Sequence, residues 1–333
     1  MSTIAEVLTL GGCQFKVFEL GRRVFKISRD DFVAFEQGAK AYPSPIQGHA
    51  CFAIVFSKPE MAQTPYLWLL KFPLDEQNKL LFGARDDFLR MVIEALGEDL
   101  ANSDSNTEAL NNHPYSLKPS DEKLAVLNAK IRNDLHQPAS IYFESAYQYF
   151  CQQPTAEGWQ TLGIQGIADV GERLCESTIK TELAARLAEL PVPAFNALSQ
   201  VLEHALLPAV VVESLLRFGA DKRDPFWIRA ISGAPQNVLI GELTQTLNSA
   251  PSIDHVITVG ARWWSVLNTP ERVLEYLESV VRLTNNFQVF AALVADLNGL
   301  PQCRPACLSA LRLPHRSEQL SIAIGQLFHT NRS

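Results

Sequence analysis

The stretches Ala50–Ser57 (ACFAIVFS) and Tyr66–Phe72 (YLWLLKF) are strongly apolar and short, which predicts two buried strands. A proline-containing loop separates them, so we expect the two strands to be neighbours in one sheet. Upstream, Cys13–Leu20 (CQFKVFEL) alternates apolar and polar residues, as a half-buried strand does. The turn Gly21–Arg23 and the strand Val24–Ile27 follow it, and this order predicts a β-hairpin.

Helix signals lie between and after these strands. Ser28, followed three residues later by Asp31, resembles a capping box that opens a helix over 30–40. Lys79–Phe82 is expected to be one more short strand, and apolar spacing predicts a helix over 84–96. The order β-β-α-β-β-β-α predicts an α+β domain with an antiparallel sheet, spanning residues 1–98.

The rest of the chain consists of a polar segment followed by a helical segment. Residues 99–119 are rich in Asn, Ser and Asp and show no apolar period, which predicts a mobile linker. From residue 120 to residue 333 the pattern is almost entirely helical, with prolines near the expected helix starts. The spacing of these helical units is close to that of a helix-turn-helix repeat. We therefore expect an all-α domain that resembles a HEAT-like α-solenoid.

Composition excludes several classes of protein. The 333 residues contain 29 Lys and Arg against 36 Asp and Glu, a formal net charge of −7, which disfavours a protein that mainly binds nucleic acid or an anionic membrane. No apolar run approaches the roughly 20 residues of a membrane span. The first ten residues contain Glu6 but no Lys or Arg, unlike a secretory signal. We expect a cytoplasmic protein whose six cysteines are reduced.

Motifs for chemistry are missing from the sequence. It contains no phosphate-binding loop, no dinucleotide-binding glycine pattern and no nucleophile elbow. Cys303 and Cys307 have the spacing of half a metal site that His315 and His329 could complete, but two small buried residues on one helix face are the simpler interpretation. We therefore predict no catalytic residue, no cofactor and no metal.

The most unusual local feature is Arg262-Trp263-Trp264, within an expected helix over 253–267. Adjacent residues on a helix project about 100° apart, so both indoles are buried only if neighbours flank both sides. Alternatively, one indole faces outward together with Arg262, Trp227 and Arg229, as in a binding hot spot. The candidate partner-binding residues are Trp227, Arg229, Arg262, Trp263 and Trp264.

Two segments carry a resemblance to a known family. Phe18–Ser28 (FELGRRVFKIS) and Leu69–Leu89 (LLKFPLDEQNKLLFGARDDFL) resemble a family of bacterial proteins with a domain of unknown function. The resemblance covers nearly the whole chain and implies a bacterial cytosolic setting. It implies no activity, ligand or catalytic residue.

Two functions are compatible with these patterns. The first is a non-enzymatic scaffold or adaptor that binds a partner protein, because stacked helix pairs offer an extended surface. The second is a nucleic-acid-binding or DNA-processing enzyme built on a HEAT-like solenoid, which the Arg-Trp-Trp cluster suggests. The negative charge of the helical part favours the first, because DNA binding depends on neutralising phosphates.

Overall fold

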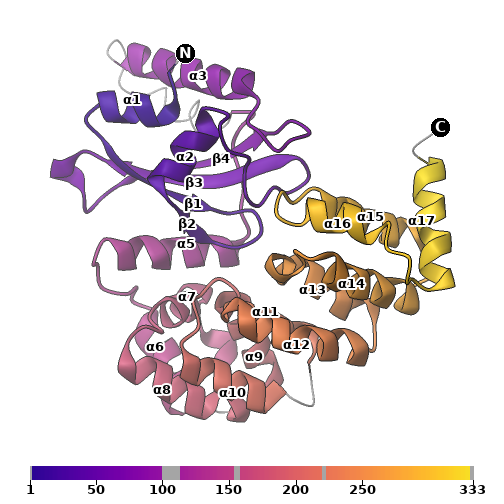
Figure 1. Cartoon of the computed structure of the whole chain (residues 1–333). Helices are drawn as coiled ribbons and strands as arrows, with labels where there is room; N and C mark the ends of the chain where they lie inside the picture. The colour runs from indigo at the N-terminus through magenta and orange to yellow at the C-terminus, as the bar shows by residue number, and fades with distance from the viewer. Residues whose placement is uncertain (1, 100–112, 154–157, 220–222, 331–333) are drawn as a thin grey trace. The chain divides into compact units, whose positions relative to one another are not determined.

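The chain folds into two units in a computed structural model, which describes residues 2–99, 113–153, 158–219 and 223–330 (Figure 1). Unit 1 comprises Met1–Ser120 and unit 2 comprises Asp121–Ser333. The boundary between them lies at the expected start of the helical region. Of the predicted linker 99–119, residues 100–112 lie outside the described residues.

Unit 1 is built on a four-stranded antiparallel sheet in the order β2-β1-β3-β4. Its strands are β1 (Gln14–Glu19), β2 (Phe25–Ile27), β3 (His49–Ser57) and β4 (Tyr66–Pro73). The predicted fifth strand at Lys79–Phe82 is wrong. Leu80 makes only an isolated bridge to Leu74, and helix α3 begins at Phe82, so no length remains for a ladder. The described end of the predicted linker instead pairs with β4, where the Lys71 N–H donates to the Tyr115 carbonyl at 2.8 Å.

One face of the sheet is covered by α1 (Ile4–Leu10), α2 (Arg29–Glu36) and α3 (Phe82–Asp99) (Figure 1). A short 3₁₀ helix, η1 (Pro59–Met61), lies between β3 and β4. Alternate strand residues face these helices, as the period of two requires. Phe52 lies at the centre of the aromatic core, with its ring 5.4 Å from that of Phe32 and 5.7 Å from that of Phe72. The predicted cap of α2 is confirmed, because the Ser28 hydroxyl accepts from the Asp31 N–H at 3.1 Å.

A buried carboxylate joins α1 to α2. Glu36, the last residue of α2, accepts hydrogen bonds from the Ile4 N–H at 2.7 Å and the Ala5 N–H at 3.0 Å. These are N–H groups of the first turn of α1, which have no partner within their own helix. Burial raises the pKa of Glu36 to about 7, although the two backbone N–H groups and the nearby Arg85 oppose the shift.

This raised pKa predicts a pH-dependent stability. The folded chain holds the Glu36 proton more tightly than the unfolded chain, whose carboxyl titrates near 4.5. The contribution of Glu36 to stability is therefore fully present below about pH 4.5 and is lost as the pH rises to about 7. As the pH rises from about 4.5 to about 7, we expect the free energy of unfolding of the variant Glu36→Gln to increase by about 2–3 kcal/mol relative to that of wild type. Urea unfolding at a series of pH values measures this difference. Parallel pH profiles of the two proteins would contradict this prediction.

The described residues of unit 2 are almost entirely helical and include four short 3₁₀ or π segments: η2 (Gln148–Gln152), η3 (Trp159–Thr161), η4 (Leu187–Glu189) and η5 (Trp264–Val266). Prolines occupy the first positions of several helices, including Pro225 in α11 and Pro270 in α14. The described α-helices are α5 (Asp121–Asp134), α6 (Phe143–Tyr147), α7 (Ile164–Glu172), α8 (Ser177–Arg186), α9 (Val192–Leu202), α10 (Ala209–Gly219), α11 (Pro225–Ile231), α12 (Gln236–Ser249), α13 (Ile253–Arg262), α14 (Pro270–Leu283), α15 (Phe287–Asn298), α16 (Arg304–Ala310) and α17 (Glu318–Thr330).

These helices pack on their next-but-one neighbours. Helix α5 contacts α7, α7 contacts α9, and the row continues through α11 and α13 to α15. Among the remaining helices, α8 contacts α10, and α12 contacts α14, which contacts α16. Helix α10 buries a single face, formed by Val211, Val212, Leu215 and Gly219, whereas its apolar pattern predicts burial on more than one side. Among the described residues, no helix is long and apolar enough to span a membrane.

Candidate functional site

The three tryptophans predicted as candidate binding residues lie in the core of unit 2. Trp227, Trp263 and Trp264 are 1%, 0% and 6% exposed. The Trp227 indole N–H donates to the Leu215 carbonyl at 2.8 Å, and that of Trp263 donates to the Ile228 carbonyl at 2.9 Å. Their two rings meet edge to face, with centroids 6.2 Å apart. Of the two interpretations of the indoles, the structure therefore shows the buried one.

The expected helix over 253–267 is too long. Helix α13 ends at Arg262, and Trp264 begins the 3₁₀ helix η5. The break removes the geometric conflict between two adjacent indoles, because the rings no longer project from one continuous helix. Each ring can then be packed by different neighbours.

Arg229 and Arg262, the two arginines among the predicted binding residues, both bind Glu203, which the sequence analysis did not single out. Glu203, which caps the C-terminus of α9, has a carboxylate that is 2% exposed. Arg229 of α11 forms a bidentate ion pair with this carboxylate, with Nε 2.7 Å from Oε2 and Nη2 3.1 Å from Oε1. Arg262 of α13 adds a third bond, from its Nε to Oε2 at 2.6 Å. One buried carboxylate thus joins three helices.

This cluster has a net positive charge. Two guanidinium groups, always protonated in proteins, share a single carboxylate. The side chains of Arg229 and Arg262 remain 25% and 23% exposed. His204 lies beside the cluster, with its Nε2 3.5 Å from Glu203 Oε1. The sequence carried no local signal for Glu203, because it lies in the apolar run VLEHALL.

The cysteine pair lies in the core. Cys303 and Cys307 are both 0% exposed, and the Cys303 thiol donates to the Trp264 carbonyl at 3.1 Å. Burial raises the pKa of Cys307 to about 11, so it stays a neutral thiol. Within the described part of the chain, no three His, Cys, Asp or Glu side chains are grouped so as to hold a metal ion.

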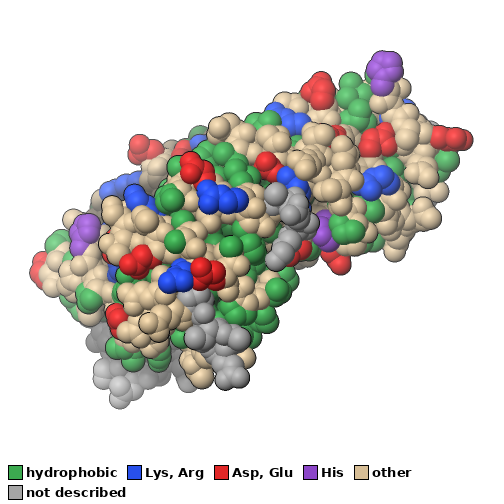
Figure 2. Space-filling view, turned by 90° about the horizontal axis from the view of Figure 1, so that it is seen from below, with side chains coloured by type: hydrophobic (Ala, Val, Ile, Leu, Met, Phe, Trp, Pro, Cys, Tyr) green, Lys and Arg blue, Asp and Glu red, His purple; other side chains and the backbone are tan. Residues whose placement is uncertain are grey.

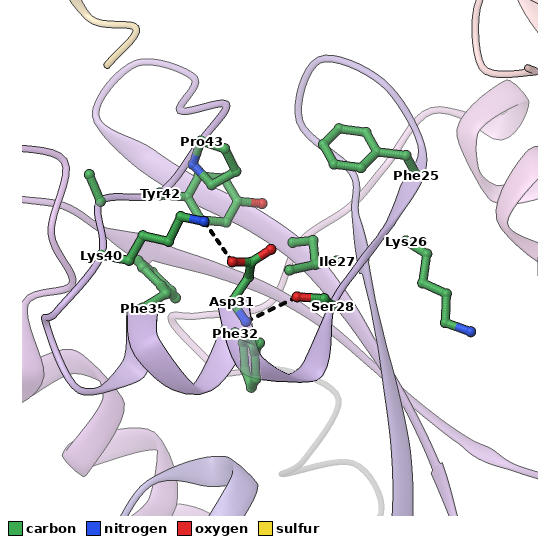
Figure 3. A pocket seen from close by; sticks show the side chains of 11 residues that line it. Phe25, Lys26, Ile27, Ser28, Asp31, Phe32, Phe35, Lys40, Tyr42 and Pro43 are labelled. Atoms are coloured by element: carbon green, nitrogen blue, oxygen red, sulfur yellow. Dashed lines mark hydrogen bonds and ion pairs between the residues drawn. The ribbon is translucent and has the colours of Figure 1, made fainter. Parts of the chain in front are cut away.

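Unit 1 contains a hollow that the sequence did not predict (Figure 3). It lies between β2, the start of α2 and the segment 40–43, and its volume is about 170 Å³. Rings and aliphatic groups form most of its wall, and an ion pair lies at its rim. The lining residues are Phe25, Lys26, Ile27, Ser28, Asp31, Phe32, Phe35, Lys40, Ala41, Tyr42 and Pro43.

The polar groups of this hollow are already engaged. The Lys40 ammonium lies 2.6 Å from the Asp31 carboxylate, and Figure 3 shows the two joined at the rim. The hydrogen bonds from Lys40 and Ser28 lower the pKa of Asp31, which therefore stays ionised. The Tyr42 hydroxyl donates to the Cys51 carbonyl at 2.8 Å, and burial raises its pKa well above the usual range. Neither the Asp31 carboxylate nor the Tyr42 hydroxyl is therefore poised for proton transfer near neutral pH.

The charges on one face of the molecule are mixed. On the face shown in Figure 2, basic and acidic side chains are interspersed and do not separate by sign. A groove that binds a nucleic-acid backbone needs clustered basic residues. This face has no such cluster among its described residues.

Comparison with known proteins identifies one family. No curated protein and no solved structure matches the chain at a significant level. The family described as "protein of unknown function (DUF3549)" matches residues 1–328, nearly the whole chain, which agrees with the resemblance seen in Phe18–Ser28 and Leu69–Leu89. The chain therefore belongs to the DUF3549 family of proteins of unknown function.

Proposed function

We propose that this chain is a non-enzymatic adaptor or scaffold protein of the bacterial cytosol, which binds a partner protein through the hollow of unit 1. The observation that carries this proposal is the size and lining of the hollow. An engineered apolar cavity of about 150 Å³ holds one benzene molecule. A hollow of about 170 Å³ therefore suits one ring or branched aliphatic side chain.

The chemistry of the lining supports a side chain as the occupant. Phe32, Phe35 and Tyr42 are nearly completely buried and form an apolar wall, while Phe25 is 36% exposed at the edge. An apolar pocket surrounded by a charged rim is the usual form of a hot spot in a protein interface. Drug-sized ligands need roughly 300–1,000 Å³, so a large substrate is a poorer fit.

The packing of unit 2 supports the scaffold part of the proposal. The contacts of many helices with their next-but-one neighbours support a HEAT-like α-solenoid as the organisation of this unit. In such a stack each helix pair contacts only its neighbours, which leaves an extended surface for a partner. The alternative of a nucleic-acid-binding enzyme loses its main support, because the indoles that suggested it are buried.

Filling the hollow is expected to weaken partner binding. Ala41 lines the hollow, and the substitution Ala41→Leu adds methyl groups that would occupy the space for the partner side chain. We expect the dissociation constant to rise about tenfold or more. The measurement begins with a partner captured by the full chain from bacterial lysate. That partner is then purified and titrated against each variant by calorimetry.

The variant Ala39→Leu is the matched control. Ala39 is exposed, precedes Ala41 by two residues and does not line the hollow. It should bind the partner as wild type does, and both variants should keep the wild-type melting temperature within a few degrees. Equal affinities of the two variants would show that the partner uses another surface. Failure to capture any stoichiometric partner at low salt would contradict the adaptor function itself.

A further inference from the structure

We propose that Arg229 and Arg262 form an oxyanion-binding site of unit 2, which takes one carboxylate or phosphate group. The site lies on the helical unit and does not depend on the hollow of unit 1. It is assembled by Glu203, whose buried carboxylate fixes the position of both guanidinium groups.

Arg229 and Arg262 each have N–H donors that do not bind Glu203. A guanidinium group has five N–H donors. Arg229 uses two on Glu203, and Arg262 uses one on Glu203 and a weak one on the Ala261 carbonyl at 3.4 Å. The buried side-chain atoms without a partner include no nitrogen of either residue, within the described part of the chain. Arg229 Nη1 and Arg262 Nη2, which make none of these bonds, are therefore exposed to solvent.

The charge balance of the cluster favours an anion. Arg229 alone neutralises Glu203 and satisfies both carboxylate oxygens through its two bonds. Arg262 is therefore not needed for neutrality and adds one positive charge. A partly buried guanidinium binds an oxyanion more strongly than a fully exposed one, because water screens the interaction less.

Two helix ends reduce this attraction. Arg229 lies in the last turn of α11 and Arg262 in the last turn of α13. Each helix C-terminus carries about half a negative charge, which stabilises the arginines and offsets part of their field. We therefore expect millimolar affinity for a free anion, with tighter binding when the anion belongs to a larger ligand.

The test is the melting temperature of the full chain in sodium phosphate and in glutarate, each compared with sodium chloride of equal ionic strength. At a phosphate concentration ten times the dissociation constant, we expect a rise of about 3 °C beyond the chloride reference. A response to phosphate alone identifies a phosphate as the ligand. A response to both identifies a general oxyanion site.

The variant Arg262→Gln removes the surplus charge while Arg229 still satisfies Glu203, and we expect it to lose the anion response. Arg186→Gln is the control, because Arg186 is an exposed arginine of the same unit paired with Glu189. The proposal is overturned if wild type shows no rise beyond chloride, or if Arg262→Gln responds as Arg186→Gln does. If Arg262→Gln does not fold, NMR signals of the Nη–H groups of Arg229 and Arg262 in the wild-type chain decide, because the Nε–H groups of both residues are bonded to Glu203. Signals that stay unmoved by phosphate would overturn the site.

Discussion

Replacing Trp263 with alanine is expected to destabilise unit 2 by about 4 kcal/mol. The side chain is completely buried, packs edge to face on Trp227 and donates its N–H to the Ile228 carbonyl. Alanine would leave a large cavity and a buried carbonyl without its donor, and both effects act in the same direction. Chemical denaturation of the full chain, followed by circular dichroism at a helix wavelength, measures the loss.

The variant Trp263→Phe separates the two contributions. It keeps most of the ring volume but removes the indole N–H, so we expect a smaller loss of about 1–2 kcal/mol. A Trp263→Ala protein within about 1 kcal/mol of wild type would contradict the burial of this residue. That outcome would restore Trp263 as a candidate surface residue.

Replacing Gly219 with alanine is expected to destabilise the chain by about 3 kcal/mol. A Cβ atom at Gly219 would lie 1.7 Å from Nε1 of Trp227, which is part of a rigid, buried ring. The ring would have to move, and the hydrogen bond from Trp227 to the Leu215 carbonyl would be lost. The melting temperature of the full chain reports the effect.

Gly241 provides a control of opposite sign. It lies within α12, where an added Cβ would have no atom within 4 Å. The substitution Gly241→Ala should therefore stabilise the helix by about 0.5–1 kcal/mol, because alanine loses less backbone entropy than glycine. A similar loss of stability in both variants would show that the close approach of Trp227 to Gly219 is not the cause.

Local signals in the sequence predicted much of unit 1. The alternation in Gln14–Glu19 and the apolar run in His49–Ser57 are properties of single strands, so they can be read without knowing the partner strand. The first helix was missed, although Thr3 and Glu6 form a capping box that the sequence displays. The incorrectly predicted strand at Lys79–Phe82 shows that a short apolar run alone does not establish a strand. Only the position of the next helix decides whether such a run extends a sheet.

The candidate sites depended on contacts between distant residues. Glu203 is 26 residues from Arg229 and 59 residues from Arg262, and no periodic pattern connects them. The hollow of unit 1 likewise combines β2, α2 and the segment 40–43. Such sites exist only after the elements have packed.

The sequence by itself determined the division into a sheet-containing part and a helical part, the positions of most strands and many helix starts. Those features arise from interactions within a few residues: alternation, capping and the fixed φ angle of proline. Only the tertiary structure decided that the indoles are buried, that Glu203 gathers two arginines and that a hollow forms beside β2. Burial and charge pairing depend on which surfaces meet, and that is a property of the whole packed unit.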